Sequence, residues 1–391
     1  MKVLTVHVAY RQHGGEDKVF LQENELLRNE GIDVQPLLLS NMSIQDDGLG
    51  AKLAIGIGTT WSLKGYQQTR EVIAGFRPDL VHFHNTFPQL SPSAYYACRN
   101  AGVPVVQTLH NYRLLCAAAT FLRDGRVCED CVPMRFYNSV KYRCYRNSSL
   151  ASLAIAGMQY VHHTVGTYRH TVDRYIALTQ FAKKKFVEGG LPESRITVKS
   201  NTLQETPEPG KGGFEVLFVG RLSPEKGIDV LLRAWREHGL QYPLRIVGDG
   251  PLRNTVEQAV RDNAYIRYTG ALAPDKCLQV IAKSAVMVLP SLWYEGFPMT
   301  VLESYAVGTP VVASKIGSLS ELVREGETGW TFPAGDSFSL AESLTAALEN
   351  PQRLKTMRGR CREEFMSRYA PERNVSELLY IYQDVIESRR N

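Results

Sequence analysis

Short apolar runs rich in β-branched residues alternate with amphipathic stretches along most of the chain. Runs of this length, bounded by polar residues, are typical of strands in a parallel sheet that is covered on both faces. In the first half the predicted strands are Val3 to Val8, Val34 to Leu39, Leu80 to Phe83, Val103 to Leu109, Tyr175 to Leu178 and Ile196 to Val198. In the second half they are Val216 to Val219, Leu244 to Val247, Tyr265 to Thr269, Val286 to Leu289 and Pro310 to Ala313. Helical patterns such as Glu16 to Asn29 lie between most of them, which predicts crossover helices.

One segment interrupts this alternation and divides the chain. Residues 204–213 read Gln-Glu-Thr-Pro-Glu-Pro-Gly-Lys-Gly-Gly, a composition that predicts a linker. We therefore expect two α/β domains, each doubly wound and Rossmann-like, at 1–203 and 214–370. The helical residues 371–391 are expected to cross back to the first domain. Ligands of such sheets bind beyond the carboxyl ends of the strands, so the residues after each strand are the candidates for a site.

Composition and charge narrow the class of protein. The 391 residues include 44% hydrophobic and 22% charged residues, as in an ordinary globular protein. The formal net charge of +5 is too small to indicate nucleic-acid binding, but it suits anionic small molecules or an anionic membrane surface. The apolar runs are too short to span a membrane, and the first residues read as a strand rather than a signal peptide. Seven cysteines cannot all pair, so we expect reduced thiols and a cytoplasmic location, with the cytoplasmic membrane face as an option.

Cations follow the first predicted strand of the second half. Residues 220–227 read Gly-Arg-Leu-Ser-Pro-Glu-Lys-Gly, which places Arg221 and Lys226 at the strand end. An arginine fork and a lysine point charge commonly hold a pair of phosphates. The alternative is a solvated turn with two surface cations. The next strand runs into Gly248-Asp-Gly-Pro, a turn that is a weaker candidate for backing a ligand.

A third segment places two carboxylates beside a helix start. Residues 295–303 read Glu-Gly-Phe-Pro-Met-Thr-Val-Leu-Glu, and we expect a helix that begins at Pro298 and ends near Gly308. The free N–H groups of such a start form an anion site. Glu295 and Glu303 then suit the sugar and ribose hydroxyls of a nucleotide sugar. The alternative is one acid that stabilises the helix dipole and one surface acid.

These three segments together resemble the donor half of a retaining GT-B glycosyltransferase, and more narrowly glycosyltransferase family 4. The spacing Glu295-x7-Glu303 is the signature of that group, and the resemblance extends over the second half of the chain. It implies a GT-B fold in which Arg221 and Lys226 neutralise the donor diphosphate, Glu295 contacts the transferred sugar and Glu303 holds the ribose. Further donor contacts are implied at Gly248, Gly270, Leu272, Gly296, Phe297, Pro298 and Met299. The chain contains no Asp-x-Asp pair, so no cofactor is expected for catalysis.

The first half offers an acceptor side. Gly14 and Gly15 form a turn after the first strand, and the resemblance implies that this loop faces the donor. His110 follows the strand Val103 to Leu109, and the family commonly places a functional histidine there, in contact with the transferred sugar. His84, after the strand Leu80 to Phe83, is a second and weaker candidate.

A cysteine-rich segment follows. Cys116, Cys128, Cys131 and Cys144 are spaced as Cys-x11-Cys-x2-Cys-x12-Cys, so they are candidates for a structural zinc site. The alternative is that they are buried or loose thiols that pack as small apolar residues. Cations and aromatic residues interleave here, as they do on surfaces that contact anionic lipid headgroups.

The segment from His82 to about Leu153 resembles a subgroup that assembles bacterial surface polysaccharides. The resemblance implies a retaining hexosyltransferase that uses a UDP- or GDP-linked sugar and a glycan or polyprenyl-diphosphate-linked acceptor. The main alternative is a sugar-nucleotide epimerase on the same architecture. A nucleic-acid-binding protein that uses the cysteine segment is disfavoured by the small net charge.

Overall fold

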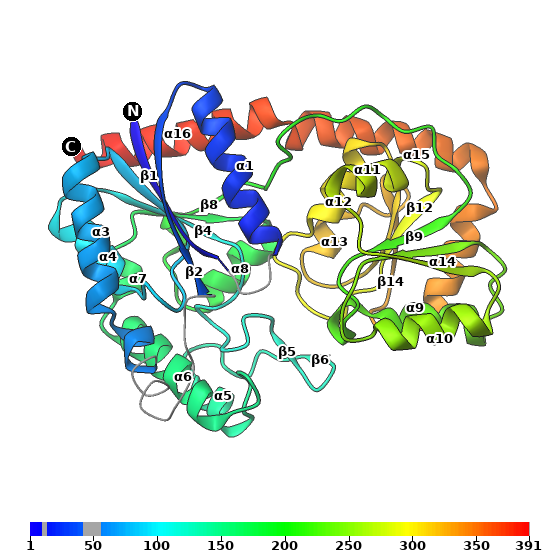
Figure 1. The fold of residues 1–391 in the computed structure, drawn as a ribbon, viewed down its shortest axis with the longest axis horizontal. Coiled ribbons are helices and arrows are strands. Elements are labelled where there is room, and N and C mark those ends of the chain that lie inside the picture. The colour runs from blue at the N-terminus through cyan, green and yellow to red at the C-terminus, as the bar shows by residue number, and fades with distance from the viewer. Residues whose placement is uncertain (10–13, 42–55, 391) are drawn as a thin grey trace. The chain divides into compact units, whose positions relative to one another are not determined.

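The computed structural model describes residues 1–9, 14–41 and 56–390, and these divide into two compact units. Unit 1 comprises residues 1–121, 129–204 and 371–391, and unit 2 comprises residues 122–128 and 205–370. Figure 1 colours the chain from blue to red, so the red helix at the end of the chain marks the return to unit 1.

Unit 1 is built on a parallel sheet of six strands in the order β2-β1-β3-β4-β7-β8, as far as its described residues show. The strands are β1 (Lys2–Ala9), β2 (Asp33–Ser40), β3 (Leu80–Asn85), β4 (Val105–Leu109), β7 (Arg174–Ala177) and β8 (Ile196–Val198). The helices are α1 (Gly15–Asn29), α3 (Leu63–Phe76), α4 (Ser93–Asn100), α5 (Tyr137–Lys141), α6 (Ser149–Thr164), α7 (Thr167–His170), α8 (Gln180–Glu188) and α16 (Pro371–Arg390). The strand order steps from β1 to both β2 and β3, as the alternating pattern predicts for a doubly wound sheet.

Side chains alternate across this sheet and bury both of its faces. On one face, Val3, Leu80, Val106 and Ile176 pack against α1 and α16. On the other face, Phe83 meets Tyr95 of α4 with ring centroids 4.9 Å apart. Helices therefore cover both faces, which explains why the strands are apolar at almost every position.

Unit 2 repeats the design with a parallel sheet in the order β11-β10-β9-β12-β13-β14. Its strands are β9 (Val216–Val219), β10 (Leu244–Val247), β11 (Ile266–Gly270), β12 (Val286–Leu289), β13 (Val311–Ser314) and β14 (Gly329–Phe332). Its helices are α9 (Ile228–Glu237), α10 (Arg253–Asp262), α11 (Pro274–Ala282), α12 (Met299–Ala306), α13 (Leu319–Leu322), α14 (Ser337–Leu348) and α15 (Pro351–Glu364). The sequence pattern missed β14, because Gly-Trp-Thr-Phe is too short for its alternation to stand out. The two-stranded hairpin of β5 (Leu122–Arg123) and β6 (Arg126–Val127) was also not predicted.

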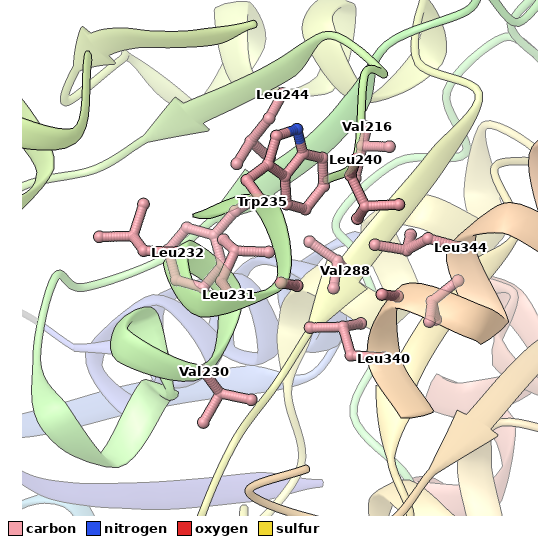
Figure 2. Close-up of a cluster of buried hydrophobic side chains, with 14 of the residues drawn as sticks. Val216, Val230, Leu231, Leu232, Trp235, Leu240, Leu244, Val288, Leu340 and Leu344 are labelled. Atoms are coloured by element: carbon pink, nitrogen blue, oxygen red, sulfur yellow. The ribbon is translucent and has the colours of Figure 1, made fainter. Parts of the chain in front are cut away.

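The core of unit 2 fills the space between its sheet and the helices α9 and α14. Trp235 of α9 lies beside Leu244 and Val216 of the sheet, and Leu340 and Leu344 of α14 approach Val288 (Figure 2). All six side chains are 4% exposed or less. The opposite face of the sheet is buried by α12, where the Ser304 hydroxyl lies 3.2 Å from the Met287 sulfur. Both sheets are therefore three-layered, as the sequence predicts.

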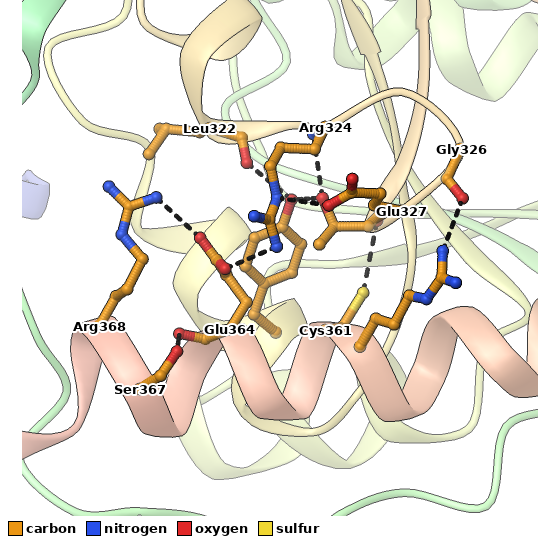
Figure 3. Close-up of polar contacts among 11 residues, drawn as sticks. Leu322, Arg324, Gly326, Glu327, Cys361, Glu364, Ser367 and Arg368 are labelled. Atoms are coloured by element: carbon orange, nitrogen blue, oxygen red, sulfur yellow. Dashed lines mark hydrogen bonds and ion pairs between the residues drawn. The ribbon is translucent and has the colours of Figure 1, made fainter.

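The tail from Pro351 to Arg390 is helical, as expected, except at Ala370, whose backbone is extended with φ −58° and ψ 142°. A five-residue π-helix, Phe365–Tyr369, separates α15 from α16. Glu364, at the end of α15, lies 2.7 Å from Arg324 and 2.9 Å from Arg368 (Figure 3). The contact with Arg324 fastens the tail to the segment between α13 and β14, whereas Arg368 lies within the tail itself. None of the described helices has the length and apolar character needed to cross a membrane.

Candidate donor and acceptor sites

The loops after three neighbouring strands of unit 2 are tied together by their backbones. The N–H of Gly220 donates to the carbonyl of Val247 at 3.1 Å, and that of Leu222 to the carbonyl of Asp249 at 2.9 Å. The N–H of Gly248 donates to the carbonyl of Gly270 at 2.9 Å. The segments that the sequence singled out after β9, β10 and β11 therefore form one connected surface at the carboxyl edge of the sheet.

Gly248 is required by this arrangement. Its φ of 140° is rarely adopted by residues with a side chain, and a Cβ atom built there would lie 1.8 Å from the carbonyl oxygen of Gly220. Gly270 also has positive φ, at 77°, but a Cβ atom there would meet nothing within 4 Å. Gly270 is the last residue of β11, so the strand ends one residue later than the sequence indicated. The absence of a side chain at Gly248 therefore allows the loops after β9 and β10 to approach closely. At Gly270, glycine is favoured only by the local backbone conformation.

Two of the predicted site residues meet directly. Nζ of Lys226 lies 2.7 Å from Oε1 of Glu295, although 69 residues separate them in sequence. The hydroxyl of Ser291 donates to the same carboxylate oxygen at 2.8 Å, and the Lys226 ammonium lies 5.3 Å from the ring centroid of Trp293. Arg221 is exposed, and its guanidinium makes no hydrogen bond or ion pair with any described residue. The edge thus carries one paired and one unpaired cation.

The helix after β12 begins one residue later than predicted. Pro298 is the N-cap and Met299 the first residue of α12, because Pro298 has extended backbone angles of φ −72° and ψ 109°. Glu295 is 6% exposed and Glu303 is 9% exposed, so neither is a surface acid. The carbonyl of Gly296 accepts from the hydroxyl of Ser318 at 3.3 Å, which holds the turn before the helix.

The remaining predicted donor contacts lie on the same part of unit 2. Phe297 is buried, and its ring centroid lies 6.1 Å from that of Tyr369. The carbonyl of Leu272 lies 3.7 Å from the sulfur of Cys277, near the start of α11. The roles of Phe297 and Leu272 toward a donor stay predictions.

In unit 1, the Gly-Gly turn forms the start of α1. Gly14 is the N-cap, and its N–H donates to Oδ2 of Asp17 at 2.7 Å. Gly15 is the first helical residue. Residues 10–13, the rest of the predicted loop, lie outside the described residues. The turn therefore places the N-terminus of α1 just after the carboxyl end of β1, a position where helix N–H groups can bind a ligand.

His110 is buried and forms a pair with His84. Nδ1 of His84 lies 2.9 Å from Nε2 of His110, and the rings stack with centroids 5.1 Å apart. Burial, followed by the charge of His82, lowers the pKa of His84 to about 4. Burial and the nearby His84 lower the pKa of His110 well below its usual value. Both rings are therefore neutral near neutral pH, and both line a cavity at the carboxyl ends of β3 and β4.

The sequence did not indicate the charged groups behind this pair. Oε1 of Glu23 lies 3.2 Å from Nδ1 of His82 and 3.2 Å from Nε2 of His84. Nζ of Lys199 lies 3.5 Å from the other oxygen of Glu23. Burial alone would raise the pKa of Glu23, but Lys199 and the two histidines outweigh it and hold the pKa well below its usual value. The one available signal was the spacing of His82 and His84, which puts both on the same face of β3.

Glu23, His82 and His84 also have the chemistry of metal ligands, and their ligand atoms lie within 4.8 Å of one another. Both nitrogens of His82 already have partners, however: Nδ1 lies 2.7 Å from the Tyr382 hydroxyl and Nε2 lies 2.8 Å from the Thr108 hydroxyl. The Lys199 ammonium balances the Glu23 carboxylate. The arrangement is therefore a self-compensated network, to which a divalent ion would add uncompensated charge.

The four clustered cysteines form no disulfide bond among the described residues, and they differ in burial. Cys116 and Cys131 are buried, whereas Cys128 and Cys144 are partly exposed. Cys131 packs against Phe136 and Ala156. A structural zinc site at these cysteines stays a prediction, as does its alternative.

Comparison with known proteins identifies the chain. Residues 213–350 match the model of the glycosyl transferases group 1 family, and residues 53–203 match that of glycosyltransferase family 4. A glycosyltransferase of Methanocaldococcus jannaschii is 24% identical over 84% of this chain and 82% of its own length. The D-inositol 3-phosphate glycosyltransferase of Acidothermus cellulolyticus is 29% identical over 80% of this chain and 68% of its own length.

Solved structures show the same fold. Anabaena HepE in complex with UDP superposes with a TM-score of 0.67 at 18% identity, covering 98% of this chain and 100% of that one. Sucrose-phosphate synthase from Thermosynechococcus elongatus superposes with a TM-score of 0.68 at 16% identity, covering 99% of each chain. These likenesses show the GT-B fold, and the matches to the two family models make the chain a glycosyltransferase. Within that class, the chain belongs to the glycosyltransferase family 4 type.

Proposed function

We propose that this glycosyltransferase moves a hexose-type sugar from a UDP- or GDP-linked donor to a glycan or polyprenyl-diphosphate-linked acceptor in polysaccharide or glycolipid biosynthesis. The observation that carries the proposal is the contact between Lys226 and Glu295 at the carboxyl edge of the second sheet. This contact supports a site in which Lys226 binds a phosphate and Glu295 accepts a hydrogen bond from a sugar hydroxyl. The solved structure of Anabaena HepE holds UDP, which agrees with a nucleotide-sugar donor.

The chemistry follows from the charges at this edge. Arg221 and Lys226 would balance the negative charge that develops on the leaving diphosphate, and the N–H groups at the start of α12 would add to this. Glu295 would accept hydrogen bonds from the transferred sugar and Glu303 from the ribose. The chain's own cations and a helix end then supply the stabilisation of the leaving group.

We further propose that the anomeric configuration is retained, by attack on the same face as the departing phosphate. The support is the resemblance to a retaining group and the absence of a pair of acids that sequence reasoning could assign to a double displacement. NMR of the first-formed product tests this proposal. An inverted anomer in that spectrum would refute retention.

The donor is tested with the purified chain and a panel of UDP- and GDP-linked hexoses. Slow release of free sugar and nucleoside diphosphate from one donor is expected, because water replaces the missing acceptor. The relatives do not favour the epimerase alternative, which predicts an epimeric nucleotide sugar instead. If every donor returns unchanged and none binds, the proposal of a nucleotide-sugar enzyme fails.

A surface of unit 1 supports peripheral contact with an anionic membrane as a further part of this proposal. The helix α6 and its C-cap residue expose a stripe of apolar side chains at helical spacing, namely Leu150, Leu153, Tyr160, Val161 and the C-cap Val165. Exposed cations precede it along the chain at Lys141, Arg143 and Arg146. An apolar stripe beside cations suits the headgroup region of a bilayer.

Vesicle co-sedimentation tests this contact. We expect binding to vesicles that contain phosphatidylglycerol and little binding to pure phosphatidylcholine. Leu153→Glu should reduce binding, whereas Leu21→Glu, an equally exposed change on α1, should not. Equal binding of both variants and wild type would contradict the role of α6.

A structural zinc ion held by Cys116, Cys128, Cys131 and Cys144 remains a separate proposal. Four thiolates would fill a tetrahedral site and leave no position for catalysis. Elemental analysis of protein purified without added metal tests it. A zinc content near zero, with four thiols that titrate readily in the folded protein, would defeat it.

A further inference from the structure

A chain of contacts leads from the first helix of unit 1 to His110. Oε1 of Glu23, on α1, lies 3.2 Å from Nε2 of His84, at the end of β3. Nδ1 of the same ring lies 2.9 Å from Nε2 of His110, which follows β4. The Glu23 side chain is 12% exposed and the His84 side chain is fully buried. Two successive contacts therefore connect a carboxylate on α1, an imidazole on β3 and a second imidazole just after β4.

The contact between the two rings holds a single proton. One ring must donate and the other must accept, because a bond with two protons or none would be repulsive. Both rings are neutral near neutral pH, since burial lowers the pKa values of His84 and His110. A neutral imidazole carries one N–H, so the nitrogen of His84 that holds the proton decides the tautomer of His110.

The charge on Glu23 determines which nitrogen of His84 carries the proton. Lys199, whose side chain is 3% exposed, lies 3.5 Å from Oε2 and favours the ionised carboxylate. An ionised Oε1 favours the proton on Nε2 of His84, 3.2 Å away, because a negative charge at this distance attracts an N–H and repels a lone pair. Nδ1 of His84 is then an acceptor, so Nε2 of His110 is the donor.

The other titratable groups around His84 are already engaged. The ring of His82 lies 4.3 Å from that of His84, but its nitrogens contact Tyr382 and Thr108. The ring of His7 lies 6.3 Å away, and Nε2 of His7 contacts Oδ1 of Asp17 at 2.7 Å. Among the groups that the structure describes, Glu23 is thus the one negative charge in contact with the His84 ring.

We propose that Glu23 is a positioning residue that acts through His84 to fix His110 in the tautomer protonated on Nε2, so that Nδ1 of His110 is a hydrogen-bond acceptor for a sugar hydroxyl in the cavity. Nδ1 of His110 makes no hydrogen bond within the described part of the chain, so it is the nitrogen left for a ligand. The identity of the ligand as a sugar rests on the proposed function, whereas the tautomer does not.

The test is a long-range ¹H–¹⁵N correlation spectrum of the full chain labelled with ¹⁵N-histidine, at neutral pH. The signals of His110 are assigned by their loss in His110→Gln. The wild type should show His110 protonated on Nε2 alone. Protonation on Nδ1 in the wild type would overturn the proposal without any further variant.

Two glutamines in place of glutamates on α1 sharpen the test. Glu23→Gln removes the charge and should shift His110 toward a mixture of both tautomers. Glu25→Gln, an exposed site on the same helix, should leave the His110 signals unchanged. An unchanged tautomer in a folded Glu23→Gln protein would also overturn the proposal. The expected tautomers in a chain that uses no nucleotide sugar would refute the proposed function and leave this inference standing.

Discussion

At the scale of single residues, the contact between Lys226 and Glu295 makes an unusually direct prediction. Lys226→Met keeps most of the apolar stem but removes the charge that would face the leaving diphosphate. Loss of one such stabilising group typically costs about 3 kcal/mol, or ~10² in rate. We expect this fall in kcat for donor turnover, measured with the best donor of the nucleotide-sugar panel.

The matched control is Lys276→Met, because Lys276 is exposed on α11. Its turnover should stay within about twofold of the wild type, as for surface changes away from a site. Turnover near that of the wild type in Lys226→Met would instead remove Lys226 from the machinery and leave Arg221 as the main cation.

A second residue-scale prediction concerns Gly248. Gly248→Ala should destabilise unit 2, because the added Cβ would overlap the carbonyl oxygen of Gly220 and the backbone angle disfavours alanine. We expect a loss of at least about 1–3 kcal/mol in the free energy of unfolding, measured by urea denaturation. Gly359→Ala is the control, since its site in α15 is open, and it should stabilise the protein by about 0.5–1 kcal/mol. Equal stability of the two variants would contradict this account.

The residues of the site were predictable to different degrees, for a physical reason. Arg221, Lys226, Glu295 and His110 each follow a strand, and the topology of a parallel sheet gathers strand ends at one edge. Glu23 lies in the middle of a helix, where a glutamate is ordinarily solvated, and only the packing of α1 on the sheet gives it partners. Sequence reasoning therefore finds groups placed by topology and misses groups placed by packing.

At the scale of elements, α15 offers a test of how the tail is held. Glu364 is buried and contacts two arginines, so Glu364→Leu leaves Arg324 and Arg368 without their shared carboxylate. Both arginines are about half exposed and can turn to water, so the expected cost lies below the ~3–5 kcal/mol of a fully buried pair. We expect about 1–2 kcal/mol in urea denaturation.

The control for α15 is Glu363→Leu. Glu363 is the preceding residue and lies on a less buried face of the helix. This change should alter the free energy of unfolding by less than about 0.5 kcal/mol. A similar loss in both variants would mean that the helix itself, and not the contacts of Glu364, determines the effect.

The elements themselves were predicted unevenly. Strands such as Val216–Val219 are apolar at every position, so the sequence pattern predicts them directly. The last strand of unit 2, Gly329–Phe332, opens with glycine and includes a threonine, which resembles a turn in the sequence. It is a strand because β13 supplies its hydrogen bonds, and that partner is not visible from local pattern.

At the scale of the whole molecule, the histidines predict acid sensitivity that is confined to unit 1. In the unfolded chain His84 takes up a proton as the pH falls below about 6.5, whereas the folded chain does so only near pH 4. Protons therefore favour the unfolded state in that window, and stability falls with falling pH by about 3 kcal/mol across it. Glu23, with a lowered pKa, adds a further loss when the pH falls below its unfolded value of 4.5.

Hydrogen exchange measured by mass spectrometry at about pH 7 and about pH 5 tests this effect. The two pH values lie above and below the pKa of a histidine in the unfolded chain, about 6.5. Peptides from β3 and β4 should lose protection at the lower pH more than peptides from β9 and β12, after correction for intrinsic exchange. His84→Gln should reduce the difference between the two pH values. Equal loss in both units would contradict the assignment to the buried histidines.

The placement of α16 has a consequence for the order in which this protein is assembled. Five side chains of α16 enter the core of unit 1, at Val375, Leu378, Ile381, Tyr382 and Val385. The ribosome delivers them only after every residue of unit 2 has been made. Unit 1, whose synthesis starts first, therefore cannot complete its core until α16 is made. Until then, the apolar face that includes Val3 and Leu80 lacks its covering helix. The unit inserted into it can finish folding earlier, so during translation the nascent first unit is the part of the chain that depends on protection from aggregation.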